Sequence, residues 1–142
     1  MYSKALMISA VALAASFGLS ASASAEMMKM KADLNAASEV PPVTSQGKGT
    51  ADITYDTASK KLSWKLNYTG LTGPATMAHF HGPAAAGVNA GVKVPIPDPK
   101  SGTEGSATLD DAQAKDLMDG KYYDNVHTDA NKGGEIRGMV TK

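Results

Sequence analysis

Two of the three histidines in the chain, His79 and His81, lie two positions apart. Side chains on an extended strand alternate between the two faces of a sheet, so both imidazoles project from one face and Phe80 from the other. The third histidine, His127, lies in a second strand-like run. Neutral imidazole suits copper, zinc and nickel. Two imidazoles from one strand and one from another are therefore candidate ligands of a single metal ion.

The rest of the coordination sphere stays open at this stage. Met77 shares the face of His79 and His81, where it either fills the core or adds a soft ligand. Met139, a carboxylate or a water molecule are the other candidates. Three imidazoles with an open position favour Cu(II) over Zn(II), and a nearby thioether would extend the preference to Cu(I). The alternative is that the histidines only brace two strands by hydrogen bonding and bind no metal.

Short strands separated by turn signals must position these residues. The clearest is 61–68, in which Leu62, Trp64 and Leu66 occupy one face and polar residues the other, so Trp64 is expected in the core. One short helix is expected over 110–118, capped by Asp110. The pattern predicts an all-β fold, an antiparallel Greek-key β-sandwich of immunoglobulin-like type with one short helix. The expected strands are 30–37, 49–55, 61–68, 75–81, 92–96, 105–109, 121–128 and 135–141.

The first 25 residues have the pattern of a secretory signal peptide. Lys4 precedes an apolar run too short to span a bilayer, and residues 23–25 read Ala-Ser-Ala, which fits a cleavage site after Ala25. Residues 26–142 suit one domain with one core. No later apolar run is long enough to cross a membrane. We expect a periplasmic or secreted protein without a membrane span in its mature form.

Composition excludes several classes of function. The 14 basic and 14 acidic residues balance, which gives no field for nucleic acid. Cysteine is absent, so thiolate metal sites, disulfides and a cysteine nucleophile are excluded. No motif of hydrolases, phosphate loops or zinc proteases occurs, and we expect no enzymatic activity. Asp124, Asp129 and Glu135 lie near His127 in sequence and either orient an imidazole or serve turns.

Four separated segments, in order, resemble the chordin-type repeat known as the CHRD domain. The resemblance covers Lys31 to Met139 and implies a β-sandwich domain of exported bacterial proteins and of animal chordins, with no settled biochemical role. One departure is Met139, which replaces the glutamine that usually follows the last Arg-Gly. The segments are Leu34–Val43, Ala78–Ala84, Leu117–Thr128 and Gly134–Gly138.

A more distant likeness is to Cu,Zn superoxide dismutase, another Greek-key sandwich in which a His-x-His strand and a later histidine bind copper. The chain lacks the fourth copper histidine, the zinc ligands and the disulfide of that family. Arg137 could mimic its anion-guiding arginine, by analogy of fold alone. Dismutation is therefore not expected.

Two functional hypotheses follow. The first is an exported copper-binding protein, a carrier, buffer or sensor, that holds Cu(II) or Cu(I) with His79, His81 and His127. The second is a non-catalytic interaction module of envelope or matrix, whose partner is another envelope protein and which has no physiological metal.

Overall fold

The computed structural model describes residue 18 and residues 24–142 of the chain. The predicted signal peptide, residues 1–25, lies almost wholly outside the described residues. The described part contains eight strands, one α-helix, α1 (Asp111–Met118), and one short 3-10 helix, η1 (Ala36–Ser38). The strands are β1 (Met27–Asn35), β2 (Lys48–Asp56), β3 (Lys61–Thr69), β4 (Ala75–His81), β5 (Val92–Ile96), β6 (Thr103–Thr108), β7 (Tyr123–Thr128) and β8 (Ile136–Thr141).

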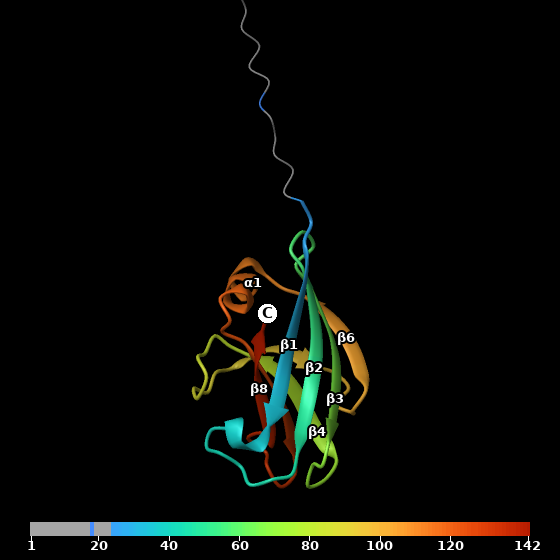
Figure 1. Cartoon of the computed structure of the whole chain (residues 1–142), viewed down its shortest axis with the longest axis vertical. Helices are drawn as coiled ribbons and strands as arrows, with labels where there is room; N and C mark the ends of the chain where they lie inside the picture. The colour runs from blue at the N-terminus through green and yellow to red at the C-terminus, as the bar shows by residue number, and fades with distance from the viewer. Residues whose placement is uncertain (1–17, 19–23) are drawn as a thin grey trace, which may run out of the picture.

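All eight strands form one antiparallel sheet in the order β5-β4-β7-β8-β1-β2-β3-β6. Figure 1 shows β1, β2, β3 and β6 side by side in one layer, with β4 running behind them. Trp64 of β3 contacts Phe80 of β4 edge to face, with ring centroids 5.4 Å apart, although five places in the sheet order separate these strands. The sheet is therefore folded over into two facing layers. The predicted all-β antiparallel fold is confirmed, with the layers formed by one continuous sheet rather than two.

The core lies between the two layers and is filled by alternate residues of the strands. Leu62, Trp64 and Leu66 of β3 are at most 4 % exposed, while Lys61 and Lys65 face solvent. The prediction that Trp64 is buried is thereby confirmed. Burial of a large aromatic side chain is one of the strongest contributions to such a core.

Helix α1 closes one end of the core, near the C-terminus (Figure 1). Asp110 accepts a hydrogen bond from the backbone N–H of Gln113, whose side chain accepts one in return from the backbone N–H of Asp110. This capping box satisfies two donors that a helix start leaves without partners. Leu117 is fully buried against the core. No helix in residues 24–142 is long and apolar enough to cross a membrane.

Candidate metal centre

Strand β4 directs both of its histidines away from the core. Ala78 and Phe80 are at most 1 % exposed and point between the layers, so His79 and His81 project from the outer face of the sheet. Strand β5 is the edge of the sheet beside β4, as expected for a strand with Pro95, which cannot donate to a ladder. The outer face of β4 is thus available to side chains of β7 on its other side.

The register between β4 and β7 brings the third histidine to the same surface. His81 pairs with Tyr123, His79 with Asn125, and Met77 with His127. Tyr123, Asn125 and His127 alternate along β7 and lie on the outer face. All three candidate ligands therefore share one face of two neighbouring strands.

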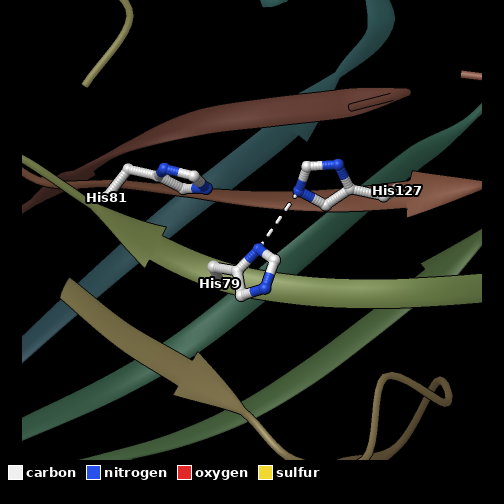
Figure 2. Close-up of side chains that lie close together, drawn as sticks. All are labelled: His79, His81 and His127. Atoms are coloured by element: carbon white, nitrogen blue, oxygen red, sulfur yellow. Dashed lines mark hydrogen bonds between the residues drawn. The ribbon is translucent and has the colours of Figure 1, made fainter. Parts of the chain in front are cut away.

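The three imidazoles point toward one another (Figure 2). His79 Nδ1 lies 3.2 Å from His127 Nε2, and one ring nitrogen of each histidine lies within 4.8 Å of the other two. Nitrogens bound to one ion at about 2.0–2.1 Å are at most about 4.2 Å apart. The His79 and His127 pair already meets this limit, whereas a pair of nitrogens 4.8 Å apart would have to close by at least about 0.6 Å.

Backbone carbonyls set the orientation of two of the rings. His127 Nδ1 lies 2.8 Å from the carbonyl oxygen of Lys132, and His81 Nδ1 lies 2.9 Å from that of Ala90. A carbonyl only accepts, so a neutral His127 ring donates from Nδ1 and keeps its lone pair on Nε2. Metal-binding histidines typically donate their other ring N–H in this way.

His81 Nε2 also lies 2.9 Å from the side-chain oxygen of Asn125. A neutral imidazole has one N–H, and it cannot donate to Ala90 and Asn125 at once. Both contacts are satisfied when the ring is protonated, or when the Asn125 amide is turned so that its nitrogen donates to Nε2.

The local environment keeps two of the rings unprotonated. Burial, and to a smaller extent the neighbouring His127 and His81, together lower the pKa of His79 to about 4. Burial also lowers the pKa of His81, although its hydrogen bonds to Ala90 and Asn125 oppose the shift. Both imidazoles are consequently neutral at pH 7, which is the form that binds metals.

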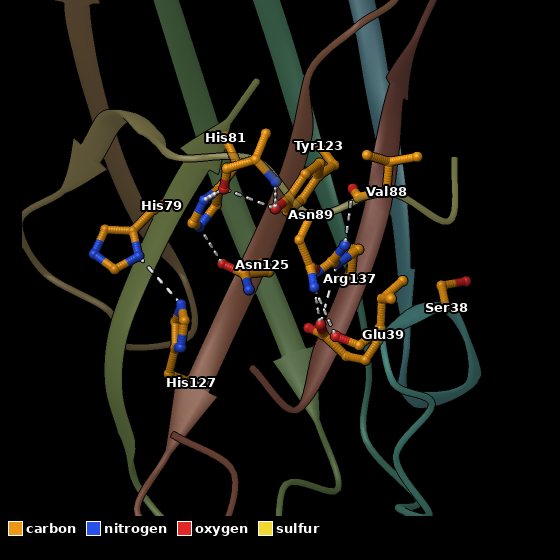
Figure 3. A network of polar contacts seen from close by, with 12 residues as sticks. Ser38, Glu39, His79, His81, Val88, Asn89, Tyr123, Asn125, His127 and Arg137 are labelled. Atoms are coloured by element: carbon orange, nitrogen blue, oxygen red, sulfur yellow. Dashed lines mark hydrogen bonds and ion pairs between the residues drawn. The ribbon is translucent and has the colours of Figure 1, made fainter. Parts of the chain in front are cut away.

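A polar network continues from the histidines across β7 and β8 (Figure 3). The ring of His81 stacks on the ring of Tyr123, with the two ring centroids 4.9 Å apart. The guanidinium carbon of Arg137 lies 4.0 Å from the centroid of the Tyr123 ring. Arg137 Nε donates to Glu39 at 3.0 Å in a fully buried ion pair. Its terminal nitrogens donate to the side chain of Asn89 and the carbonyl of Val88. This network fastens residues 82–91 and the segment after η1 over the outer face.

The anion-guiding analogy for Arg137 is wrong. Its side chain is 5 % exposed, and Glu39, Asn89 and Val88 occupy its donors. A guiding arginine must offer free donors to a passing anion. Arg137 instead stabilises the layer next to the histidines.

The nearby carboxylates do not orient the imidazoles. Asp124 points into the core and is fully buried, and Asp129 is exposed without a hydrogen bond to a histidine. Burial would raise the pKa of Glu135, but hydrogen bonds from Thr72, Asn131 and Thr128 together lower it. Glu135 thus joins two loops, and among the described residues the orienting role belongs to backbone carbonyls and Asn125.

The two methionine candidates are placed differently. Met77 lies on β4 directly opposite His127. Met139 lies on β8 opposite Tyr123, one strand further from β4, and lines a cavity of about 330 Å³ with Glu39 and Arg137. The structure does not bring Met139 to the histidines. Sequence reasoning did not single out Asn125, although its alternation with His127 could have placed it on the same face.

The family model of the CHRD domain matches residues 30–140. This chain belongs to the CHRD-domain family. The match covers all three histidines, the Glu39 and Arg137 pair and every strand, apart from the outermost residues of β1 and β8. No curated protein and no solved structure gives a significant match. The resemblance inferred from separated motifs is confirmed.

Proposed function

We propose that this CHRD domain binds one copper ion through His79, His81 and His127 and serves as an exported copper carrier, buffer or sensor. The observation that carries the proposal is the convergence of three ring nitrogens within 4.8 Å on one face of the sheet. Two of these rings are held by backbone carbonyls, as metal-binding histidines usually are.

Copper is favoured over other metals by the chemistry of the ligand set. Imidazole binds copper, zinc and nickel, and the affinity of nitrogen sites for divalent ions peaks at Cu(II). The chain has no cysteine, so no thiolate shifts the preference toward a structural zinc site. The signal-peptide pattern of residues 1–25 supports a periplasmic or secreted location, where the bound ion would be collected from outside the cytoplasm.

A binding role without catalysis is part of the proposal. The carboxylates near the centre are engaged elsewhere, because Glu39 pairs with Arg137 and Glu135 accepts hydrogen bonds from two loops. No general acid or base is thereby left beside the three imidazoles among the described residues. A protein that binds, holds and releases an ion needs no such group.

The second candidate is an interaction module in which the histidines only brace the structure. One observation favours it: His81 and His127 hydrogen bond to the carbonyls of Ala90 and Lys132, and so fasten two loops to the sheet. In that case the partner is another envelope protein, and the imidazoles contribute to stability rather than to metal affinity.

Metal analysis separates the two candidates. The parent protein and the triple variant His79→Ala, His81→Ala, His127→Ala are loaded with copper and desalted, and copper per chain is measured. We expect about one equivalent in the parent and none above background in the variant, with circular dichroism showing both folded. A folded parent without copper, or a triple variant that retains it, would support the interaction module instead.

A further inference from the structure

We propose that the thioether of Met77 is a fourth ligand of this centre and that it enables the site to hold copper as Cu(I). This inference rests on the proposed copper site and assigns to it a further residue and an oxidation state.

The backbone places Met77 beside the three imidazoles. It precedes His79 by two residues on β4 and therefore shares its face. It is also the register partner of His127 on β7. Residues directly opposite in an antiparallel pair have Cβ atoms about 4.5–5.5 Å apart. The unbranched side chain of methionine then has enough length to bring its sulfur to an ion held by His127.

The strand is irregular at this residue. The register of β4 against β7 shifts between Ala75 and Met77. Irregularities of this kind redirect the side chain where they occur and are common beside functional sites. From Met77 to His81 the pairing is regular, so the shift ends where the candidate ligands begin.

Met77 lies outside the buried core. Its side chain contributes nothing to the core, because the residue is 46 % exposed while its neighbours Ala78 and Phe80 are at most 1 % exposed. Single exposed apolar residues are common on proteins and need no explanation by themselves. Met77 differs from the exposed Met27 on β1 in lying next to three convergent imidazoles.

A thioether changes which ion the site prefers. Sulfur of methionine is a soft ligand that selects Cu(I), whereas three imidazoles alone favour Cu(II). A centre with three nitrogens and one thioether therefore binds both oxidation states, and the sulfur contributes mainly to Cu(I).

The experiment compares Cu(I) and Cu(II) affinities of the parent with those of Met77→Leu, which keeps volume and apolarity but removes the sulfur. Met27→Leu is the matched control, because it removes an exposed methionine far from the histidines. We expect Met77→Leu to lower Cu(I) affinity at least tenfold and to change Cu(II) affinity by less than about threefold. Met27→Leu should leave both unchanged. X-ray absorption of the Cu(I) form should show one sulfur scatterer in the parent and none in Met77→Leu.

The outcomes distinguish this inference from the proposed function. A parent that binds copper through its histidines but shows equal Cu(I) affinity in Met77→Leu overturns the role of Met77 and leaves the three-histidine site intact. A parent that takes up Cu(II) but no Cu(I) has the same meaning. A parent that binds neither ion overturns both proposals.

Discussion

Strands β3 and β7 lie in the two facing layers of the same sheet and differ in the burial of their outward-facing side chains. In β3 the outer residues Lys61 and Lys65 are exposed, and the inner ones are buried, in strict alternation. In β7 all six residues are buried. The difference arises because residues 82–91 and the segment after η1 cover the outer face of β7 and β8.

The two strands differ in where their outward-facing side chains find partners. A solvent-facing side chain on β3 can form its hydrogen bonds with water and needs no partner within the protein. A polar side chain on the outer face of β7 must find its partner within the protein, because a buried polar group without one destabilises the fold. His127, Asn125 and Tyr123 each contact a defined group, so their side chains are held in place before any ligand arrives.

The largest effect is expected from Trp64→Ala, which breaks the core between the two layers. Trp64 is 4 % exposed and contacts Phe80, on the strand that carries His79 and His81. Truncation of a buried tryptophan should lower the free energy of unfolding by about 3–5 kcal/mol. Urea denaturation of parent and variant measures it, and an unchanged midpoint would place Trp64 outside the core.

A loss of similar size is expected from Arg137→Ala, which breaks the covered layer of β7 and β8. Burial raises the pKa of Glu39 while Arg137 opposes the shift, so the variant leaves a buried carboxylate without its cation. Loss of one partner of a buried pair costs about 3 kcal/mol or more. Without Arg137 the folded-state pKa of Glu39 rises further above its unfolded value, so stability should be lost as pH rises.

Thermal unfolding of the Arg137→Ala variant at pH 5 and pH 8 tests this account. The deficit relative to the parent should be larger at pH 8, and Glu39→Gln added to Arg137→Ala should remove the difference between the two pH values. An equal deficit at both would show that Glu39 does not titrate in the variant.

Asp124 is the exception in β7, since both of its carboxyl oxygens are buried and have no hydrogen-bond partner within the described residues. Burial raises its pKa well above the usual value of 3.8. A carboxyl with a raised folded pKa stabilises the fold only below its unfolded pKa, and stability falls as pH rises above about 4. Asp124→Asn should therefore exceed the parent in stability by about 1–3 kcal/mol at pH 8 and lose this advantage near pH 4. A constant difference across this range would show that Asp124 is ionised in the folded state.

The smallest effect concerns the metal-free protein in acid. The folded pKa of His79 is about 4, below the usual 6.5, so the stability contributed by its neutral form is complete above pH 6.5 and is lost as pH falls toward 4. The melting temperature of the metal-free parent should decrease over this range, and His79→Gln should make the decrease shallower. Identical curves for the two proteins would contradict the lowered pKa.

The layer that contains β3 was easier to predict from the sequence than the covered layer that contains β7. Alternation of Leu62, Trp64 and Leu66 is local, so the face and burial of β3 followed directly. The shared face of His79 and His81 was equally local. The pairing of β4 with β7 was not predictable, since 41 residues separate β4 from β7 and the register depends on the whole sheet.

The partners of the histidines were also beyond local reasoning. Glu39 and Arg137 are 98 residues apart and meet only because β1 and β8 are neighbours. Asn125 lies in the predicted strand 121–128, but only the ladder with β4 makes it a partner of His81. Copper itself stays a prediction, because residue types and geometry define a group that could hold a metal ion without naming the ion.

His127→Ala distinguishes a metal site built from two strands from a pair of histidines on β4 alone, because His127 is the candidate imidazole on β7. Copper affinity of the parent and of this variant is measured by competition titration at pH 7, with circular dichroism as a folding control. We expect the variant to fold and to bind copper at least tenfold more weakly than the parent. A folded His127→Ala protein that binds as tightly as the parent would reduce His79 and His81 to a simple chelating pair and contradict the site.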